Sequence, residues 1–93
     1  MKFNDLQTVE RFVGEFCHDH NVGSIPVMLS TKYNRVDIDL TYCCLSADIV
    51  QDWLAQHMGR LGYLYDVWFP DREPHRTLCV SEREEFGKSS VAA

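Results

Sequence analysis

The alternation of apolar and polar positions predicts two helices and four short strands. Apolar residues recur every three or four positions from Leu6 to His20, which is the period of a helix with one buried stripe. We expect Asn4 to cap this helix. We expect it to end near Asn21, with Gly23 just beyond. The first segment is therefore predicted to be an amphipathic helix.

A hairpin is expected next. The apolar, β-branched run 25–31 predicts a strand, and residues 32–35 predict its turn, with Asn34 at a left-handed position. Strict alternation over 36–44 predicts a second strand with one packed face and one open face. The residues predicted to point inward are Val36, Ile38, Leu40, Tyr42 and Cys44. Those predicted to point outward are Asp37, Asp39, Thr41 and Cys43.

A second helix and a second pair of strands follow. The helix is expected to open at Ser46 and to end at Gly59 or Gly62. Residues 63–69 predict a third strand rich in aromatics, 70–76 a loop, and 77–82 a fourth strand. In the fourth strand we predict Leu78 and Val80 to point inward and Cys79 to point outward. The predicted inner stripe of the helix is Val50, Trp53, Leu54, His57 and Leu61, with Ile49 and Met58 at its edges.

The fold class follows from this order. We predict an α+β two-layer sandwich, with two helices on one face of a four-stranded, mostly antiparallel sheet, in the order α-β-β-α-β-β. Residues 1–82 are expected to form one domain, and 83–93 a flexible C-terminal tail. The order of the strands in the sheet is left open.

The uncovered face of the sheet collects the candidate partner-binding residues. In segment 63–69 the odd positions are all apolar, and an unpaired Asp is costly to bury, so Asp66 and Trp68 are placed outward. An acidic surface beside an exposed Trp is typical of an interface. The alternative is a solvated face on which the Trp lies flat over its neighbours. The candidates are Met28, Asp37, Asp39, Asp66 and Trp68.

Composition narrows the function classes. The 93 residues include 14 acids and 9 bases, a formal charge of −5, which argues against direct binding of nucleic acid. No apolar run is long enough to span a membrane, and acids occur early in the chain where a signal peptide would be apolar. We therefore expect a cytoplasmic protein. Its four cysteines are then expected to be free, mostly buried thiols.

Some residues suggest catalysis, each with a more ordinary interpretation. Asp37, Asp39 and Asp66 together would suit a hard cation, but D-x-D is also what an amphipathic strand looks like. The sequence Cys17-His18-x-His20 would suit zinc or simply interact with the helix end.

Two further features each have a functional and an ordinary interpretation. His57 with Cys17 or Cys44 would suit a nucleophile pair, or His57 is a satisfied core residue. The loop 71–76 would bind an anion through its two arginines and its histidine, or it is an ordinary solvated loop. No catalytic residue, metal ligand or cofactor is assigned.

The leading hypothesis is a small, acidic, non-enzymatic interaction protein that inhibits or adapts a partner protein. Negative charge would steer it toward a basic surface, such as that of a machine that handles nucleic acid, as an anti-CRISPR or other phage inhibitor would. A homodimer is the oligomer we expect. The alternative hypothesis is a small metal-dependent hydrolase or nuclease that uses the Asp cluster or the Cys and His groups.

Overall fold

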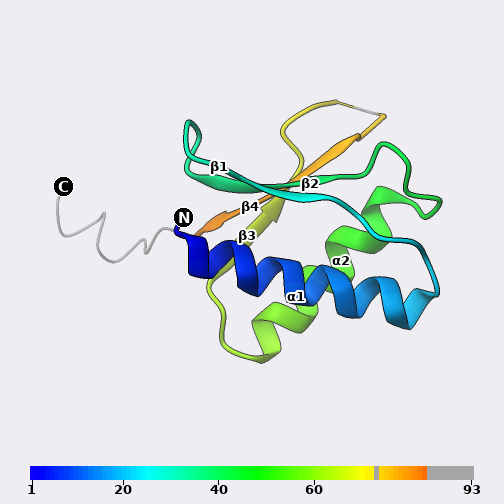
Figure 1. Cartoon of the computed structure of the whole chain (residues 1–93), viewed down its shortest axis with the longest axis horizontal. Coiled ribbons are helices and arrows are strands. Elements are labelled where there is room, and N and C mark those ends of the chain that lie inside the picture. Colours follow the sequence, from blue (N-terminus) through cyan, green and yellow to red (C-terminus); the bar gives the residue numbers. More distant parts are fainter. Residues whose placement is uncertain (73, 84–93) are drawn as a thin grey trace, which may run out of the picture.

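In the computed structural model, which describes residues 1–72 and 74–83, two helices cover one face of a four-stranded antiparallel sheet (Figure 1). The predicted α+β class and element order are confirmed. The strand order is β1-β2-β4-β3, so the last strand lies between β2 and β3. The tail expected at 83–93 lies outside the described residues beyond Arg83. The elements are α1 (Phe3–His20), β1 (Val27–Ser30), β2 (Arg35–Asp39), α2 (Ala47–Arg60), β3 (Tyr65–Trp68) and β4 (Thr77–Glu82).

The core lies between the helices and the inward rows of the two central strands. Burial of these side chains removes apolar surface from water, which is the main favourable term in folding. Among the described residues no polar or charged side chain is buried, and none of their helices is long and apolar enough to cross a membrane. The largest fully buried side chains are Phe12 and Phe16 of α1, Ile38 of β2, Leu54 and Met58 of α2, and Leu78 of β4.

The ends of α1 are fixed by short polar contacts. The helix begins at Phe3, because the Asp5 carboxylate accepts a hydrogen bond of 2.7 Å from the backbone N–H of Lys2. The prediction of Asn4 as the cap is therefore wrong. Asn21 ends the helix as predicted, in the left-handed conformation at φ 53°. The left-handed position predicted for Asn34 is also confirmed, at φ 51°.

β2 is shorter than its alternation predicted. It ends at Asp39, whose side chain accepts a hydrogen bond of 2.9 Å from the N–H of Thr41 and turns the chain. Tyr42 is consequently 94% exposed and Cys44 is exposed, so their predicted inward positions are wrong. Cys43, predicted outward, packs against the core instead.

The second half follows the predictions more closely. Ser46 caps α2, and the helix ends at Arg60. Leu61 is 66% exposed, so its predicted place on the inner stripe is wrong, and Met58 is buried there instead. In the third strand the inward choice is confirmed. Tyr63, Tyr65, Val67 and Phe69 all pack against the core.

One polar contact joins the two layers at the start of α1. The Tyr65 hydroxyl donates a hydrogen bond of 2.7 Å to Asp5 Oδ1. Burial, together with the Asp5 carboxylate, raises the pKa of Tyr65 well above its usual value. Burial also raises the pKa of Asp5, but the hydrogen bonds from Lys2 N–H and Tyr65 outweigh it and leave that pKa lowered. Asp5 is therefore an ionised anchor between α1 and β3.

Candidate interaction surfaces

The face of the sheet away from the helices, called the open face here, is built by strand register. Met28 pairs with Asp37, Asp37 with Cys79, and Cys79 with Trp68. These four residues therefore form one row across all four strands, with side chains on the same side. Register brings Met28 and Trp68, forty positions apart in the chain, onto a single surface.

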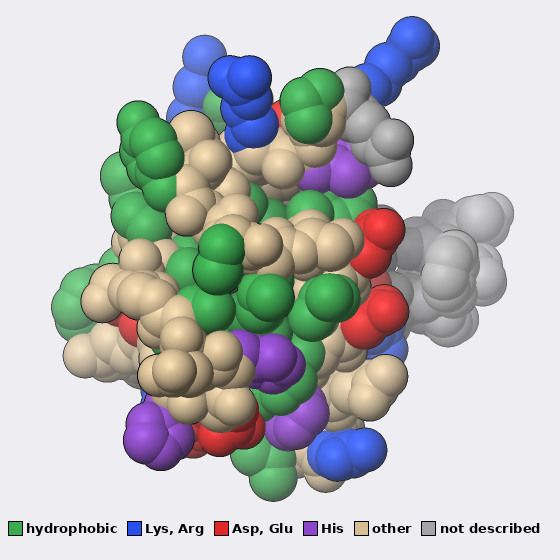
Figure 2. All heavy atoms as spheres, turned by 90° about the vertical axis from the view of Figure 1, so that its right-hand side faces the viewer, with side chains coloured by type: hydrophobic (Ala, Val, Ile, Leu, Met, Phe, Trp, Pro, Cys, Tyr) green, Lys and Arg blue, Asp and Glu red, His purple; other side chains and the backbone are tan. Residues whose placement is uncertain are grey.

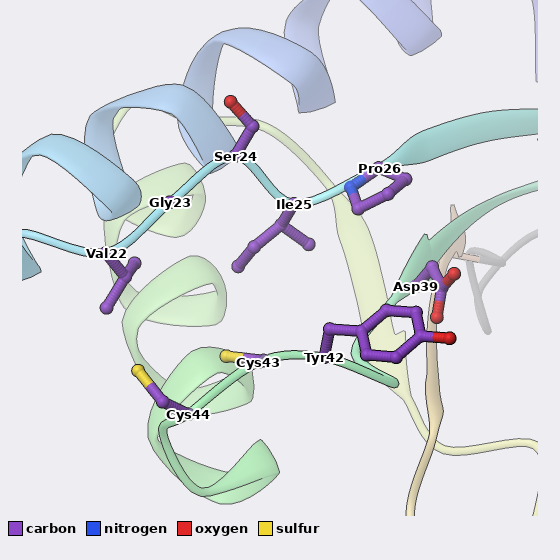
Figure 3. Close-up of a pocket in the computed structure, with 9 residues that line it drawn as sticks. All are labelled: Val22, Gly23, Ser24, Ile25, Pro26, Asp39, Tyr42, Cys43 and Cys44. Carbon is purple, nitrogen blue, oxygen red and sulfur yellow. The ribbon is translucent and has the colours of Figure 1, made fainter.

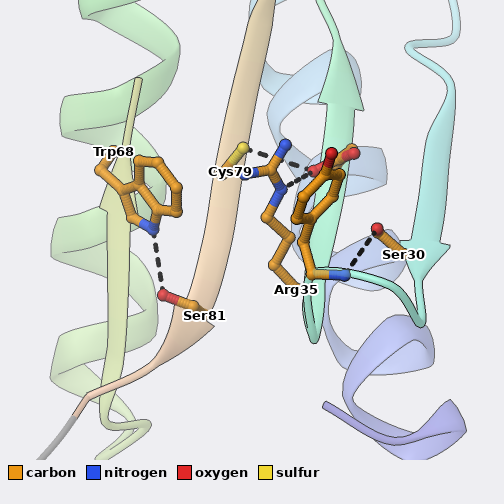
Figure 4. A network of polar contacts seen from close by, with 7 residues as sticks. Ser30, Arg35, Trp68, Cys79 and Ser81 are labelled. Carbon is orange, nitrogen blue, oxygen red and sulfur yellow. Dashed lines mark hydrogen bonds and ion pairs between the residues drawn. The ribbon is translucent and has the colours of Figure 1, made fainter. Parts of the chain in front are cut away.

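Arg35 organises the centre of this face (Figure 4). Its Nε donates a hydrogen bond of 2.8 Å to Asp37 Oδ1, and its guanidinium lies 4.6 Å from the Tyr33 ring centroid and 5.4 Å from that of Trp68. An Arg plane against aromatic rings combines cation–π attraction with packing. The Asp37 charge predicted to face a partner is thus compensated by Arg35.

Cys79 lies beneath this cluster and is fully buried, although its side chain is on the open face as predicted. Its Sγ donates a hydrogen bond of 3.3 Å to Asp37 Oδ1. Burial and the Asp37 carboxylate raise the pKa of Cys79 to about 12. Because the thiolate is the nucleophile, a thiol that stays protonated is unreactive at neutral pH. Cys79 is therefore a packing residue.

The polar groups on the β3 side of the open face also have partners within the chain. Trp68 is half-buried, and its Nε1 donates a hydrogen bond of 3.0 Å to Ser81 Oγ. Arg83 Nε donates a hydrogen bond of 3.0 Å to Asp66 Oδ1 in an exposed ion pair. Exposed pairs of this kind add little stability but do cancel local charge. Asp66 is therefore not a free acid on this surface.

The structure places all five predicted partner-binding residues on the open face. Met28, Asp37 and Asp39 line one hollow of about 310 Å³ near β1 and β2. Asp66 and Trp68 lie on β3, the strand at the opposite edge. Hydrogen bonds from Thr41 lower the pKa of Asp39, so this carboxylate is ionised at neutral pH. The predicted acidic cluster thus reduces to one charge without an ion-pair partner among the described residues, that of Asp39.

The residues considered for catalysis are engaged elsewhere. Within residues 1–72 and 74–83, no three His, Cys, Asp or Glu side chains are arranged to hold a metal ion. His20 stacks on Phe16 and His57 on Trp53, each with Nδ1 facing a backbone carbonyl. A ring nitrogen that faces a carbonyl donates its hydrogen there, which leaves Nε2 as the acceptor of the ring. Burial raises the pKa of Cys17, which keeps that thiol protonated.

The loop considered for anion binding is held by its own contacts. The His75 ring stacks on Phe69 with 3.9 Å between centroids, and its Nδ1 lies 3.4 Å from Asp71 Oδ1. Arg72 and Arg76 are exposed. No hydrogen bond or ion pair among the described residues joins the two arginines into one site.

A second hollow, which we did not predict, lies at the end of the molecule where α1 finishes. Figure 2 shows hydrophobic side chains gathered on this end with histidines beside them. The hollow has a volume of about 180 Å³ and lies between segments 22–26 and 42–44, with Tyr42 at its mouth (Figure 3). A signal for it was present in the sequence. A strand reaching residue 44 would leave one residue before the Ser46 cap, and connections this short are uncommon.

Comparison with protein-family models, curated proteins and solved structures finds no significant match to this chain.

Proposed function

We propose that this chain is a small, non-enzymatic interaction protein whose open face binds a partner protein and inhibits or adapts it. The observation that carries the proposal is the uncovered face of the sheet with its aromatic, Met and Arg side chains. Met28 is 65% exposed and Tyr33 58% exposed, so both side chains are accessible to a partner.

The residue types of the open face support binding of a protein. Aromatic residues, Met and Arg are enriched in protein interfaces, and Trp, Tyr and Arg are the commonest hot spots. Here Arg35 lies against Tyr33 and Trp68, so these side chains are already ordered before a partner arrives. Pre-ordered side chains lose less entropy on binding, which favours affinity.

The negative charge of the chain supports a partner with a basic surface, but fewer charges are free on the open face than the sequence suggested. The net charge of −5 attracts basic surfaces at long range. At the open face itself the specific contribution comes from Asp39, because Asp37 pairs with Arg35 and Asp66 with Arg83. A protein that handles nucleic acid in the cytoplasm offers such a basic surface, which is the target an anti-CRISPR or other phage inhibitor would use. The metal-dependent hydrolase draws no support from the described residues.

The experiment is affinity capture from the source cell with matched variants. Asp39→Asn removes the charge and keeps the acceptor for Thr41, and Trp68→Ala removes the aromatic anchor. Asp52→Asn on the exposed side of α2 is the control. Circular dichroism of each variant checks that it is folded.

A captured protein supports the proposal if the control binds it like wild type and both open-face variants bind it at least about tenfold more weakly, a loss of about 1.4 kcal/mol. Capture that is equal for all four chains would overturn the proposal. So would a partner whose binding depends only on Asp52.

A further inference from the structure

The two edges of the sheet are unequal. β1 and β3 are the outermost strands, on opposite sides of the sheet (Figure 4). At the β3 edge, Val67 O accepts a hydrogen bond of 2.9 Å from Gln51 Nε2, and Tyr65 O accepts one of 3.1 Å from Arg83 Nη2. Side chains from α2 and the end of β4 therefore occupy the outward carbonyls of β3. Natural sheets protect their edges in this way against further strands.

The β1 edge lacks this protection. The N–H of Asp39 donates to Pro26 O at 2.9 Å, and hydrogen-bonded pairs alternate along an antiparallel ladder. The backbone N–H and C=O groups of Met28 and Ser30 therefore point toward β2. Those of Val27 and Leu29 point outward, past the edge of the sheet. No hydrogen bond among the described residues engages the outward groups of Val27 and Leu29. The edge is a ready template for one more strand.

A groove runs beside this edge on the helix side. It has a volume of about 310 Å³, and its lining includes Val13, Gly14 and Cys17 of α1 and Val27 of β1. One charged residue, Glu10, also lines it and is exposed. A Cβ built on Gly14 would meet nothing within 4 Å, so α1 leaves open space there. Backbone pairing with pockets for alternate side chains is how sheets recruit an added strand.

We propose that β1 is the docking edge for a second copy of this chain, which pairs with it antiparallel about Met28. In that register Val27 of each copy pairs with Leu29 of the other, and both sets of outward backbone groups are satisfied. The two Met28 side chains meet on the axis, and each Leu29 enters the groove beside Val27 of the other copy. The two sheets then form one continuous sheet.

The absence of charged side chains on β1 favours a second copy of this chain as the occupant. A two-fold interface sets each residue against its own kind or a close neighbour, so charged residues there would repel one another. Residues 26–31, Pro-Val-Met-Leu-Ser-Thr, carry no charge in a chain of net charge −5. Pairing also covers Met28, whose side chain is 65% exposed in the single chain.

This inference does not depend on the proposed function. Pairing at β1 covers Met28 but leaves the rest of the open face accessible, including Arg35 on β2 and Trp68 on β3. The test below uses the purified chain with no partner protein. Its failure would therefore leave the binding of a partner by the open face intact, and failure of the capture experiment would leave the dimer intact.

The experiment measures mass against concentration by sedimentation equilibrium, from about 5 μM to about 500 μM, a range suited to a short interface. The wild type should rise from one 10.8 kDa chain toward twice that mass. Gly14→Trp fills the groove and should remain monomeric. Gly59→Trp is the matched control on α2, also with open space at the Cβ, and should behave as wild type.

Two further measurements identify the pairing itself. Met28→Lys and Met28→Glu should each be monomeric, because like charges would meet on the axis, and an equal mixture of the two should dimerise. Amide exchange followed by NMR should show Val27 and Leu29 N–H groups more protected at high concentration than at low.

A wild type that is monomeric at every concentration would overturn the proposal. A dimer that survives both Gly14→Trp and Met28→Lys would also overturn it, because another surface would then be responsible. A mixture of the Lys and Glu variants that stays monomeric would rule out pairing about Met28.

Discussion

Replacing Tyr65 by phenylalanine tests the contact that joins β3 to the first turn of α1. The substitution keeps the ring and removes the hydroxyl, which donates a hydrogen bond of 2.7 Å to Asp5 Oδ1. A hydrogen bond to a charged group contributes about 1.5–3 kcal/mol. Because Tyr65 is half-buried, the lower end of that range applies. We expect Tyr65→Phe to lower the free energy of unfolding at pH 7 by about 1.5 kcal/mol.

The same contact fixes the sign of a pH dependence. The pKa of Asp5 is lowered in the folded state, where the hydrogen bonds from Lys2 and Tyr65 outweigh the effect of burial. A carboxyl of this kind stabilises the fold above its unfolded pKa of about 4. That contribution is lost as the pH falls through the folded pKa. The difference between wild type and Tyr65→Phe should therefore be largest at pH 7 and smaller near pH 3.

Urea unfolding followed by circular dichroism measures both effects. With a slope of about 1.2 kcal/mol/M, a loss of about 1.5 kcal/mol lowers the midpoint by roughly 1.2 M. Tyr63→Phe is the matched control. The Tyr63 hydroxyl accepts only an exposed hydrogen bond of 3.4 Å from Arg11, so its loss should change the free energy of unfolding by less than about 0.5 kcal/mol. Equal destabilisation by the two variants, or the same Tyr65→Phe effect at both pH values, would refute the reasoning.

Three further predictions concern the core, a helix end and the cysteines. Leu54→Ala should lower the free energy of unfolding, measured in urea, by about 3 kcal/mol, because Leu54 is fully buried. Leu61→Ala, at the residue that follows α2, should lower it by less than about 0.5 kcal/mol, because Leu61 is 66% exposed. Asn21→Ala should lower the thermal midpoint by several degrees, a cost of about 1 kcal/mol, and Asn21→Gly should not, because residue 21 is left-handed. Equal midpoints for these two variants would contradict that assignment. On the native protein at pH 8, Ellman's reagent should modify exposed Cys44 quickly and should leave buried Cys79 unmodified until denaturant is added. The variant Cys44→Ser should lack the fast phase of this reaction.

The predicted site shows which properties of a surface can be read from neighbouring positions in the sequence. Alternation along β2 and β3 put Asp37, Asp39, Asp66 and Trp68 on the open face, and the structure places them there. The sequence prediction misses their charge balance, because it places Arg35 in the turn and not on the strand beside Asp37. The spacing of two between Arg35 and Asp37 already put them on one face of a strand. The pairing of Asp66 with Arg83 was beyond reach, because it depends on the register of β3 with β4.

The hollow at the end of α1 and the buried thiol of Cys79 illustrate the same limit. The alternation of apolar and polar residues does not show where a strand stops. The strand ends at Asp39, whose side chain turns the chain, and Tyr42 is therefore exposed and not buried as predicted. An outward position does not mean an exposed one either. Cys79 points outward as predicted, but Arg35 and Trp68 from the neighbouring strands cover it.

By itself the sequence determined the two helices, the four strands, their order along the chain and most of the inward and outward assignments. These follow from periodicities of 3.6 and 2 that any short segment displays. Only the tertiary structure decided the strand order, which residues pair across strands, and which backbone edge is left open. Those properties depend on contacts between segments far apart in the chain, such as Val36 with Val80, and no local pattern encodes them. The protected edge at β3 and the open edge at β1 therefore became visible only in the folded chain.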